Sequence, residues 1–257
     1  MTDVSPDRRT RIAAAFARAH RYEDAATVQR ASAESLAARI AAADLVPAPR
    51  ILELGCGTGF LTSAVARALG PARWTVSDIA PAMIERARDA TGIVADYRVL
   101  DGEAIDPAIG HFDLIASNLA FQWFEDLSLA VSRLASLLNE QGLLAFTTMA
   151  AGSFPEWTEA LAADGLMSGT PAYPGEPALA ALVPGLAGSV EIIDFAQPQR
   201  DASAFLHRLK AIGAGTPAEG YRPLGPAALR GAMARFDAGP RIVTWRIAFC
   251  LFRRISG

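Results

Sequence analysis

The sequence contains almost no lysine. Of its 24 basic residues 23 are arginine, and the single lysine is Lys210, in the stretch "FLHRLKAIGAGTP". A lone lysine on a helix is usually a solvated charge, yet an ammonium kept against so strong a bias toward arginine is a candidate for binding an acidic group. From residue 200 onward there are ten basic residues and only three acidic ones. Either this end of the chain meets an acidic partner, or the arginine bias has simply scattered charge over its surface.

Cysteine and histidine are scarce as well. The two cysteines, Cys56 and Cys250, lie far apart in the sequence, which indicates neither a disulfide framework nor a zinc site and favours a reducing compartment. The three histidines are His20, His111 and His207, and none has acidic neighbours at the spacing of metal ligands. We therefore expect no bound metal.

Long apolar runs and a strong net charge are also missing. No run approaches the roughly 18 apolar residues of a membrane span. The first 21 residues are rich in arginine and alanine, but acidic residues interrupt them and no apolar signal core follows. The net charge of −3 argues against general nucleic-acid binding. We expect a cytoplasmic monomer with no membrane or nucleic-acid partner.

Hydrophobic periodicity predicts an α/β protein. Apolar residues spaced by three or four over residues 8–43 predict one or two amphipathic helices. From residue 50 to 149, short apolar segments alternate with helical segments of about ten residues, which implies a parallel sheet with helices on both faces. The predicted strands are 50–55, 74–78, 96–101, 112–118 and 142–149, and the predicted helices are 60–70, 81–90 and 127–138.

The pattern becomes less regular after Met149. It predicts a helix at 154–163, a glycine- and proline-rich connection at 168–178, a strand at 190–195, helices at 205–212 and 226–236, and a last strand at 241–252. That last strand is apolar on both faces, so we expect neighbouring elements to cover it. We predict a single compact domain made of an N-terminal helical lid (1–45), a core (46–150), and cap helices with the final strands (151–257).

A glycine-rich turn, "LELGCGTGFL", lies between the first strand and the following helix. Glycines at such a turn let a ligand approach the backbone, and the helix start offers unpaired N–H groups. Alone this signal is weak, because NAD, FAD and S-adenosylmethionine sites all use a similar turn. The spacing E-x-G-x-G-x-G, with Glu53 at the strand end, differs from the dinucleotide spacing G-x-G-x-x-G.

Residues at the ends of the next two strands make the prediction of the ligand more specific. Asp78 closes the second strand, where a carboxylate accepts hydrogen bonds from ribose hydroxyls. Asp101 and Gly102, in "VLDGEAI", follow the third strand and suit an adenine amino group. Landmarks at three successive strand ends favour an adenosyl site.

At this point the chain resembles the class I S-adenosylmethionine-dependent methyltransferases. The resemblance rests on "LELGCGTG", "SDIAPAMIERAR", "LDGEAI" and "FDLIASNLAFQW" and covers roughly residues 45–150. It implies a Rossmann-like fold with a mostly parallel seven-stranded sheet, S-adenosylmethionine as cofactor and S-adenosylhomocysteine as product. The cofactor-binding residues that it implies are Gln29, Glu53, Gly55, Cys56, Gly57, Asp78, Ile79, Met83, Asp101, Gly102, Asn118 and Leu119.

The chemistry of methyl transfer limits which acceptor groups fit this sequence. Phenol, catechol and amine acceptors need a base or a metal, whereas a carboxylate with a pKa of about 4 is already ionised at pH 7. A site without a base works by aligning the reactants and excluding water. Phe121, Trp123 and Phe124 follow the fourth strand and could form such a shell, with Tyr22 closing it from the N-terminal helix. Simple packing explains Phe121 and Phe124 equally well.

Beyond the core, the chain resembles the malonyl-acyl-carrier-protein O-methyltransferases of biotin synthesis. The segments "AAAFARAHRYEDAATVQRASAESLA", "SNLAFQW", "LLAFTTMAAGSFPEW" and "LKAIGAGTP" carry this resemblance, while residues 168–198 match little. It implies methylation of the free carboxylate of a malonyl thioester, with an acidic acyl-carrier protein as transient partner. It also implies Tyr22, Gln122 and Trp123 as catalytic residues, and Trp123 and Lys210 as substrate or carrier contacts.

Lys210 then has two possible uses, pairing with the malonyl carboxylate or binding the carrier protein. Tight pairing would stabilise the nucleophile and slow its attack, so the surface use is physically easier. Two other functions stay open. One is methylation of a different small carboxylate, as in enzymes similar to those that esterify trans-aconitate, and the other is a non-catalytic, cofactor-binding assembly factor. Malonyl-coenzyme A is an alternative form of the substrate.

Overall fold

A computed structural model describes residues 26–211 and 221–255, without the side chains of residues 210 and 211. Within them a seven-stranded sheet has the order β3-β2-β1-β4-β5-β7-β6. Strands β1 to β5 pair in parallel, and β7 lies antiparallel between β5 and β6. The strands are β1 (Arg50–Leu54), β2 (Arg73–Asp78), β3 (Ala95–Val99), β4 (Phe112–Asn118), β5 (Leu138–Met149), β6 (Ala187–Pro198) and β7 (Ile242–Arg253).

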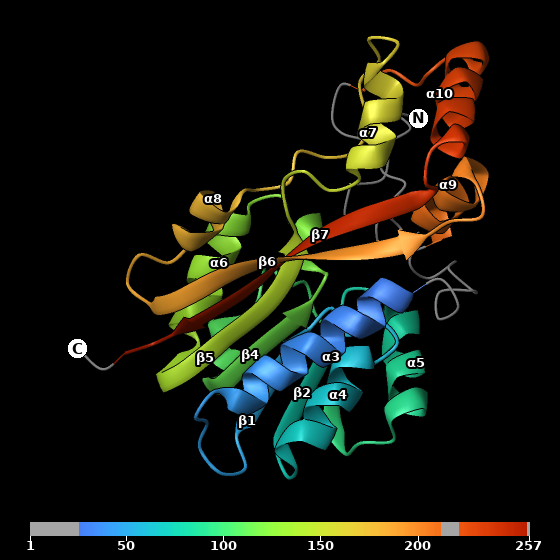
Figure 1. The fold of residues 1–257 in the computed structure, drawn as a ribbon. Coiled ribbons are helices and arrows are strands. Elements are labelled where there is room, and N and C mark those ends of the chain that lie inside the picture. Colours follow the sequence, from blue (N-terminus) through green and yellow to red (C-terminus); the bar gives the residue numbers. More distant parts are fainter. Residues whose placement is uncertain (1–25, 212–220, 256–257) are drawn as a thin grey trace, which may run out of the picture.

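Helices cover both faces of the sheet (Figure 1). On one face lie α3 (Thr27–Ala42), α4 (Phe60–Leu69) and α5 (Pro81–Thr91), and on the other lie α6 (Leu127–Ser136) and α8 (Glu176–Ala180). The central strands are buried on both faces because neighbouring residues such as Ile51 and Leu52 point to opposite clusters. This two-sided burial holds the carboxyl ends of β1 and β4 in fixed positions.

Three further helices form a cap at one end of β6 and β7 (Figure 1). They are α7 (Pro155–Ala162), α9 (Ala202–Ala211) and α10 (Pro226–Ala238). Their shared core is aromatic, with ring centroids 4.8 to 6.2 Å apart, and burial of such large rings dominates the packing energy. Its members are Phe154, Trp157, Phe205, Phe236 and Trp245.

The structure confirms the predicted order of strands and helices and corrects some boundaries. The helix predicted to end at residue 138 ends at Ser136, because Leu138 already pairs with Phe112 as the first residue of β5. The strand predicted at 190–195 spans twelve residues, since β7 pairs along all of it. The short helix α8 and the turns η1 (Pro107–Ile109) and η2 (Phe121–Trp123) were not predicted. Strand β7 is paired on both sides, as expected.

Of the predicted lid, residues 26–45 are described, and most of them form α3. Helix α3 lies against α4 and reaches the ends of β4 and β5. The proposed lid and core boundaries at residues 45 and 150 stay predictions. None of the helices in the described ranges is long and apolar enough to cross a membrane.

Candidate active site

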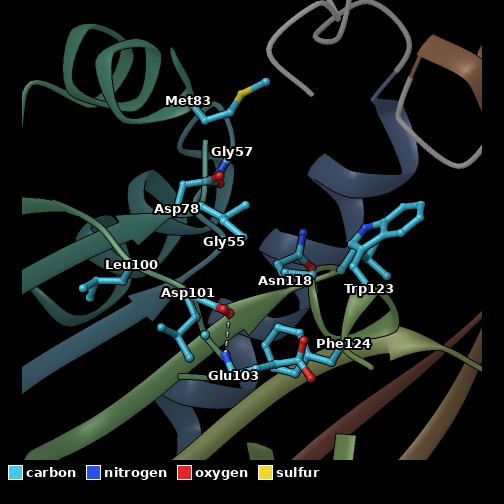
Figure 2. A pocket seen from close by; sticks show the side chains of 15 residues that line it. Gly55, Gly57, Asp78, Met83, Leu100, Asp101, Glu103, Asn118, Trp123 and Phe124 are labelled. Carbon is cyan, nitrogen blue, oxygen red and sulfur yellow. Dashed lines mark hydrogen bonds between the residues drawn. The ribbon is translucent and has the colours of Figure 1, made fainter. Parts of the chain in front are cut away.

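A cleft opens where the carboxyl ends of β1, β2, β3 and β4 meet, the usual place for a ligand in an open parallel sheet. Figure 2 shows Asp78 and Met83 on one side of it and Asn118 and Trp123 on the other. Two carboxylates at successive strand ends, Asp78 and Asp101, face the same space as predicted. The lining residues are Leu54, Gly55, Gly57, Asp78, Ile79, Met83, Leu100, Asp101, Gly102, Glu103, Asn118, Leu119, Ala120, Trp123 and Phe124.

The glycine turn after β1 has a conformation that other residues adopt with difficulty. Gly55, Gly57 and Gly59 have φ angles of +67°, +53° and +85°. At Gly55 space is also lacking, because a Cβ there would lie 2.5 Å from Ala120 Cβ in the loop after β4. The turn therefore passes directly beside the neighbouring loop and leaves its backbone exposed to the cleft.

Asp78 holds this turn in place. Its Oδ2 accepts a 3.0 Å hydrogen bond from the Gly57 amide, and its Oδ1 accepts a 2.8 Å bond from the Ala80 amide. Burial raises the pKa of the carboxyl group, while the two amides act in the opposite direction. The sequence predicted only a ribose contact for Asp78, and the structure adds this second task.

Glu53 lies beneath a second, smaller cavity next to the cleft. Its side chain is 1% exposed, and Oε2 has no hydrogen-bond partner. Burial raises the pKa of Glu53 to about 8, with a smaller contribution from the charge of Asp78, while the neighbouring Thr62 acts in the opposite direction. This cavity shares Gly55, Gly57 and Asn118 with the cleft, and its other lining residues are Gln29, Cys56, Thr58, Phe60 and Leu61.

An unpaired, buried carboxylate oxygen needs a cation or a proton. A ligand ammonium entering the second cavity would provide the missing partner. The adjoining cleft meanwhile has room for an uncharged ring system beside Leu100 and Met83. The two neighbouring cavities, which share Gly55, Gly57 and Asn118, therefore suit a ligand with an adenosyl part and an amino-acid part.

Asn118, at the end of β4, ties helix α3 to the site. Its Nδ2 donates to the Gln29 carbonyl at 3.0 Å, and its Oδ1 accepts from Ser32 Oγ at 2.9 Å and from Thr147 Oγ1 at 2.8 Å. Leu119 follows with a φ of +52°, and its amide donates to Thr147 Oγ1 at 2.9 Å. Buried bonds hold this strained backbone beside Asn118, which lines both cavities.

The aromatic segment after β4 divides into two parts. Trp123 and Phe124 line the cleft, whereas Phe121 is 1% exposed and packs against Phe146 with ring centroids 4.6 Å apart. Gln122 does not line the cleft. Its Nε2 donates a 2.5 Å bond to the Leu119 carbonyl, and its buried Oε1 has no partner.

The predicted site residues are thus only partly brought together. Ile79, Met83, Asp101, Gly102, Asn118 and Leu119 line the cleft, and Gln29 and Cys56 line the second cavity. Burial raises the pKa of the Cys56 thiol, which disfavours a reactive thiolate at this position. Tyr22 lies outside the described residues, and Lys210 belongs to α9 without a described side chain.

Sequence reasoning missed three residues that shape the site: Ser32, Thr147 and Glu103. Glu103 offered a signal, since it stands two positions after Asp101 in "LDGEAI". The other two are ordinary helix and strand residues, and only their contacts with Asn118 reveal them. Among the described residues no group of three or more His, Cys, Asp or Glu side chains could hold a metal ion.

Comparison with known proteins agrees with this geometry. A family model described as a methyltransferase domain matches residues 51–142. The chain is 34% identical over 254 residues to a malonyl-[acyl-carrier protein] O-methyltransferase from Magnetococcus marinus, covering 96% of this chain and 94% of that protein. It is 38% identical to the protein of the same name from Enterobacter lignolyticus, covering 79% of each.

A longer relative is 46% identical over 259 residues. It is the biotin biosynthesis bifunctional protein BioCD from Bordetella avium, and the match covers all of this chain but only 55% of that protein. The chain thus spans about half the length of this relative.

Solved structures share the fold at low identity. The YcgJ protein from Bacillus subtilis has a TM-score of 0.59 at 16% identity, covering 87% of this chain and 99% of that one. The N-methyltransferase NodS from Bradyrhizobium japonicum, solved with S-adenosyl-L-homocysteine, has a TM-score of 0.50 at 19% identity, covering 87% and 86%. These likenesses establish the class I methyltransferase architecture for the chain.

Proposed function

The chain belongs to the malonyl-[acyl-carrier protein] O-methyltransferase family, and from that premise we propose that it methylates the free carboxylate of a malonyl thioester on an acyl-carrier protein. The observation that carries the proposal is the similarity that runs through 94% of a relative of that name. The methyl group comes from S-adenosylmethionine, which leaves S-adenosylhomocysteine. The ester masks the malonyl charge, so that the enzymes that elongate acyl chains for biotin accept it.

Three carboxylates are proposed to hold the cofactor. Glu53 would take its ammonium, because Oε2 is buried without a partner. Asp78 would bind the ribose and Asp101 the adenine, since both line the cleft at successive strand ends. When bound, S-adenosylmethionine supplies an electrophilic methyl group on a positively charged sulfur. The remaining proposed cofactor contacts are Gln29, Gly55, Cys56, Gly57, Ile79, Met83, Gly102, Asn118 and Leu119.

The described residues of the cleft favour an acceptor that needs no base. The described lining of the cleft includes no histidine, lysine or tyrosine, and its carboxylates, Asp78, Asp101 and Glu103, already accept hydrogen bonds from backbone amides. His111 precedes β4, at the edge of the sheet opposite the cleft, and His207 is exposed on α9. A carboxylate acceptor is already ionised at pH 7, so the chain has only to orient it and exclude water.

Trp123 is the proposed acceptor contact, because it lines the cleft beside Asn118 (Figure 2). Gln122 supports the turn that carries Trp123 through its bond to the Leu119 carbonyl. Tyr22 is proposed to complete the acceptor site from the N-terminal segment. In all three cases the contribution is positioning, which accounts for large rate factors when the reacting atoms are held in line.

The acidic carrier protein is proposed to bind the basic C-terminal part of the chain, from residue 200 onward. The structure narrows the available surface, because several of these arginines already pair within the chain: Arg235 with Asp164, Arg246 with Asp194, and Arg200 with Asp201. Lys210 on α9 is the residue we propose for carrier contact. Its role would be steering, which acts mainly on association and weakens with salt.

Intact-mass analysis tests the reaction directly. Malonyl-carrier protein is incubated with the enzyme and S-adenosylmethionine, beside acetyl-carrier protein and malonyl-coenzyme A. A gain of one methyl on the malonyl carrier and none on the acetyl carrier is the expected result. No gain, with cofactor binding demonstrated by calorimetry, would keep the fold and the cofactor but reject this acceptor.

Two further proposals concern the state of the protein. We propose that it acts in the cytoplasm, supported by the fact that Cys56 and Cys250 are both unpaired and buried. We also propose that it is a monomer. Gel filtration with light scattering checks the second statement.

A further inference from the structure

The loops after β3 and β4 are fastened together by one buried side chain. Glu103 is 8% exposed, and its Oε1 accepts hydrogen bonds from the amides of Glu125 at 2.9 Å and Asp126 at 3.0 Å. Glu103 follows the strand end with Asp101, whereas Glu125 and Asp126 follow Trp123 and precede α6. One carboxylate oxygen thus joins the adenine side of the cleft to its acceptor side.

The backbone of Glu103, in the loop after β3, is held by two further hydrogen bonds. The Glu103 amide donates to Asp101 Oδ1 at 2.9 Å, and the Glu103 carbonyl accepts from Arg133 Nη1 at 2.8 Å. These two bonds use the backbone of Glu103, so they do not depend on its carboxylate. Removing the carboxylate therefore takes away the bonds to the Glu125 and Asp126 amides, while the bond from Arg133 of α6 to the Glu103 carbonyl still links the two regions.

Packing reinforces the contact between the loops. Gly102 lies against the ring of Phe124, and a Cβ at Gly102 would be 2.8 Å from Phe124 Cζ. Asp101, Glu103 and Phe124 line one continuous region of the cleft (Figure 2). Trp123 immediately precedes Phe124 in this loop, two residues before the Glu125 amide that Glu103 holds.

The position of the carboxylate also explains why it is stable there. Asp126 is the N-cap of α6, with Oδ1 accepting from the Leu129 amide. The Glu103 carboxylate bonds to the amides just before the first turn of this ten-residue helix, where negative charge is favourable. Charge-assisted bonds to two amides offset the cost of burying the group.

We propose that Glu103 is a positioning residue of the methyl-transfer reaction, which fixes Trp123 against the cofactor cleft by tying the loop after β4 to the loop after β3. Glu103 acts on the acceptor indirectly, by holding the loop that carries Trp123 and Phe124. The kinetic part of this inference rests on the proposed function. The structural part, that the carboxylate holds the Glu125 and Asp126 amides, does not.

Hydrogen exchange tests the structural part in the full-length enzyme with S-adenosylhomocysteine. Glu103→Ala should speed exchange of the Glu125 and Asp126 amides by about tenfold or more. Glu103→Gln, which keeps one acceptor oxygen without its charge, should give an intermediate rate. Asp106→Ala is the matched control, because Asp106 caps the Ala108 amide in the same β3–β4 connection and does not reach this loop. Equal rates in wild type and Glu103→Ala overturn the proposal.

Kinetics tests the functional part. Glu103→Ala should lower kcat/KM for the malonyl carrier by about tenfold or more, while the Kd for S-adenosylhomocysteine changes less than about threefold. Glu103→Gln should recover much of the activity. Faster loop exchange with unchanged acceptor kinetics, or an equal loss in cofactor affinity, would show that Glu103 does not position the acceptor side. If wild-type enzyme methylates no malonyl carrier, the proposed function fails, and the exchange comparison still decides whether Glu103 holds Trp123's loop.

Discussion

Ser32 Oγ donates a 2.9 Å hydrogen bond to Asn118 Oδ1, which joins helix α3 to the end of β4 across 86 residues of sequence. Ser32 is fully buried and Asn118 lines both cavities of the site. The same asparagine donates to the Gln29 carbonyl one turn earlier in the helix. The first turn of α3 is thus part of the wall of the site, and its position depends on a side chain at the centre of the sheet.

Ser32→Ala should weaken binding of S-adenosylhomocysteine by about three- to tenfold, because a buried hydrogen bond worth about 1 kcal/mol is lost at Asn118, which lines both cavities. Isothermal calorimetry measures the Kd. Ser35→Ala is the control on the same helix, since among the described residues the Ser35 hydroxyl accepts a hydrogen bond from the side chain of Arg39 and does not reach Asn118. Equal small effects of the two variants would contradict a role for the Asn118 contact.

Glu53 should couple cofactor binding to proton release. With a pKa raised to about 8 by burial, Glu53 is mostly protonated in the free enzyme at pH 7. A ligand ammonium beside Oε2 favours the ionised form, so binding lowers this pKa and expels up to about one proton. Affinity for S-adenosylhomocysteine should therefore rise between pH 6 and about 7.5. Calorimetry in buffers of different ionisation enthalpy measures the released proton.

The variant Glu53→Gln tests whether the proton released on binding comes from Glu53 or from another group. The variant cannot ionise at this position, so its binding should release less than about a third of a proton and its affinity should be nearly flat over the same pH range. Proton release as large in the variant as in the wild type would place the titrating group elsewhere.

The same residue should affect stability in the absence of ligand. An acid whose pKa is higher in the folded than in the unfolded protein binds more protons when folded, so stability falls as pH rises from the unfolded value of 4.5 toward about 8. Glu53→Gln removes this loss. Its Tm should exceed that of the wild type by about 2 °C or more at pH 8 and by less at pH 5.5. A Tm difference that is the same at both pH values would contradict the raised pKa.

Gly55→Ala should abolish cofactor binding through two separable effects. One is the left-handed φ of +67°, and the other is the 2.5 Å contact with Ala120 Cβ. Gly92→Ala shares a similar φ, +61°, at the end of α5 but meets nothing within 4 Å, so it should cost only about 1 kcal/mol of stability. Adding Ala120→Gly to Gly55→Ala should restore part of the binding, as measured by calorimetry. No rescue would assign the whole loss to backbone strain.

Much of the fold was predictable because local hydrophobic patterns in the sequence indicate the order of strands and helices. Five short apolar segments alternate with helical ones, and this alone implies a parallel sheet with Asp78 and Asp101 on one edge. The boundaries were less accessible. The early end of α6 and the full length of β6 depend on pairing with strands distant in the sequence, to which a local pattern is blind.

Site residues that follow the end of a strand could be predicted from the sequence. Site residues that act by contacting side chains or amides of distant elements could not. Gly55, Asp78 and Asp101 stand out by position. Ser32 and Glu103 do not, because their partners lie on other elements. The second task of Asp78, holding the glycine turn through the Gly57 amide, is equally invisible in the sequence. Motifs predict the class of ligand, whereas only tertiary contacts reveal the residues that hold the binding residues in position.

Lys210→Glu should raise the KM for the malonyl carrier by about threefold or more at low salt and leave kcat nearly unchanged, because a steering charge acts on association rather than on the chemical step. The effect should shrink above about 0.3 M salt, where the Debye length falls well below the distances between surface charges.

Arg67→Glu is the matched control, as it makes the same change of charge at an exposed position on α4, far from α9 (Figure 1). The two outcomes separate the two uses of the lysine. A raised KM that salt abolishes supports docking of the acidic carrier. A fall in kcat that salt does not affect would instead indicate that the ammonium acts on the malonyl carboxylate, and equal behaviour of both variants would make Lys210 an ordinary surface charge.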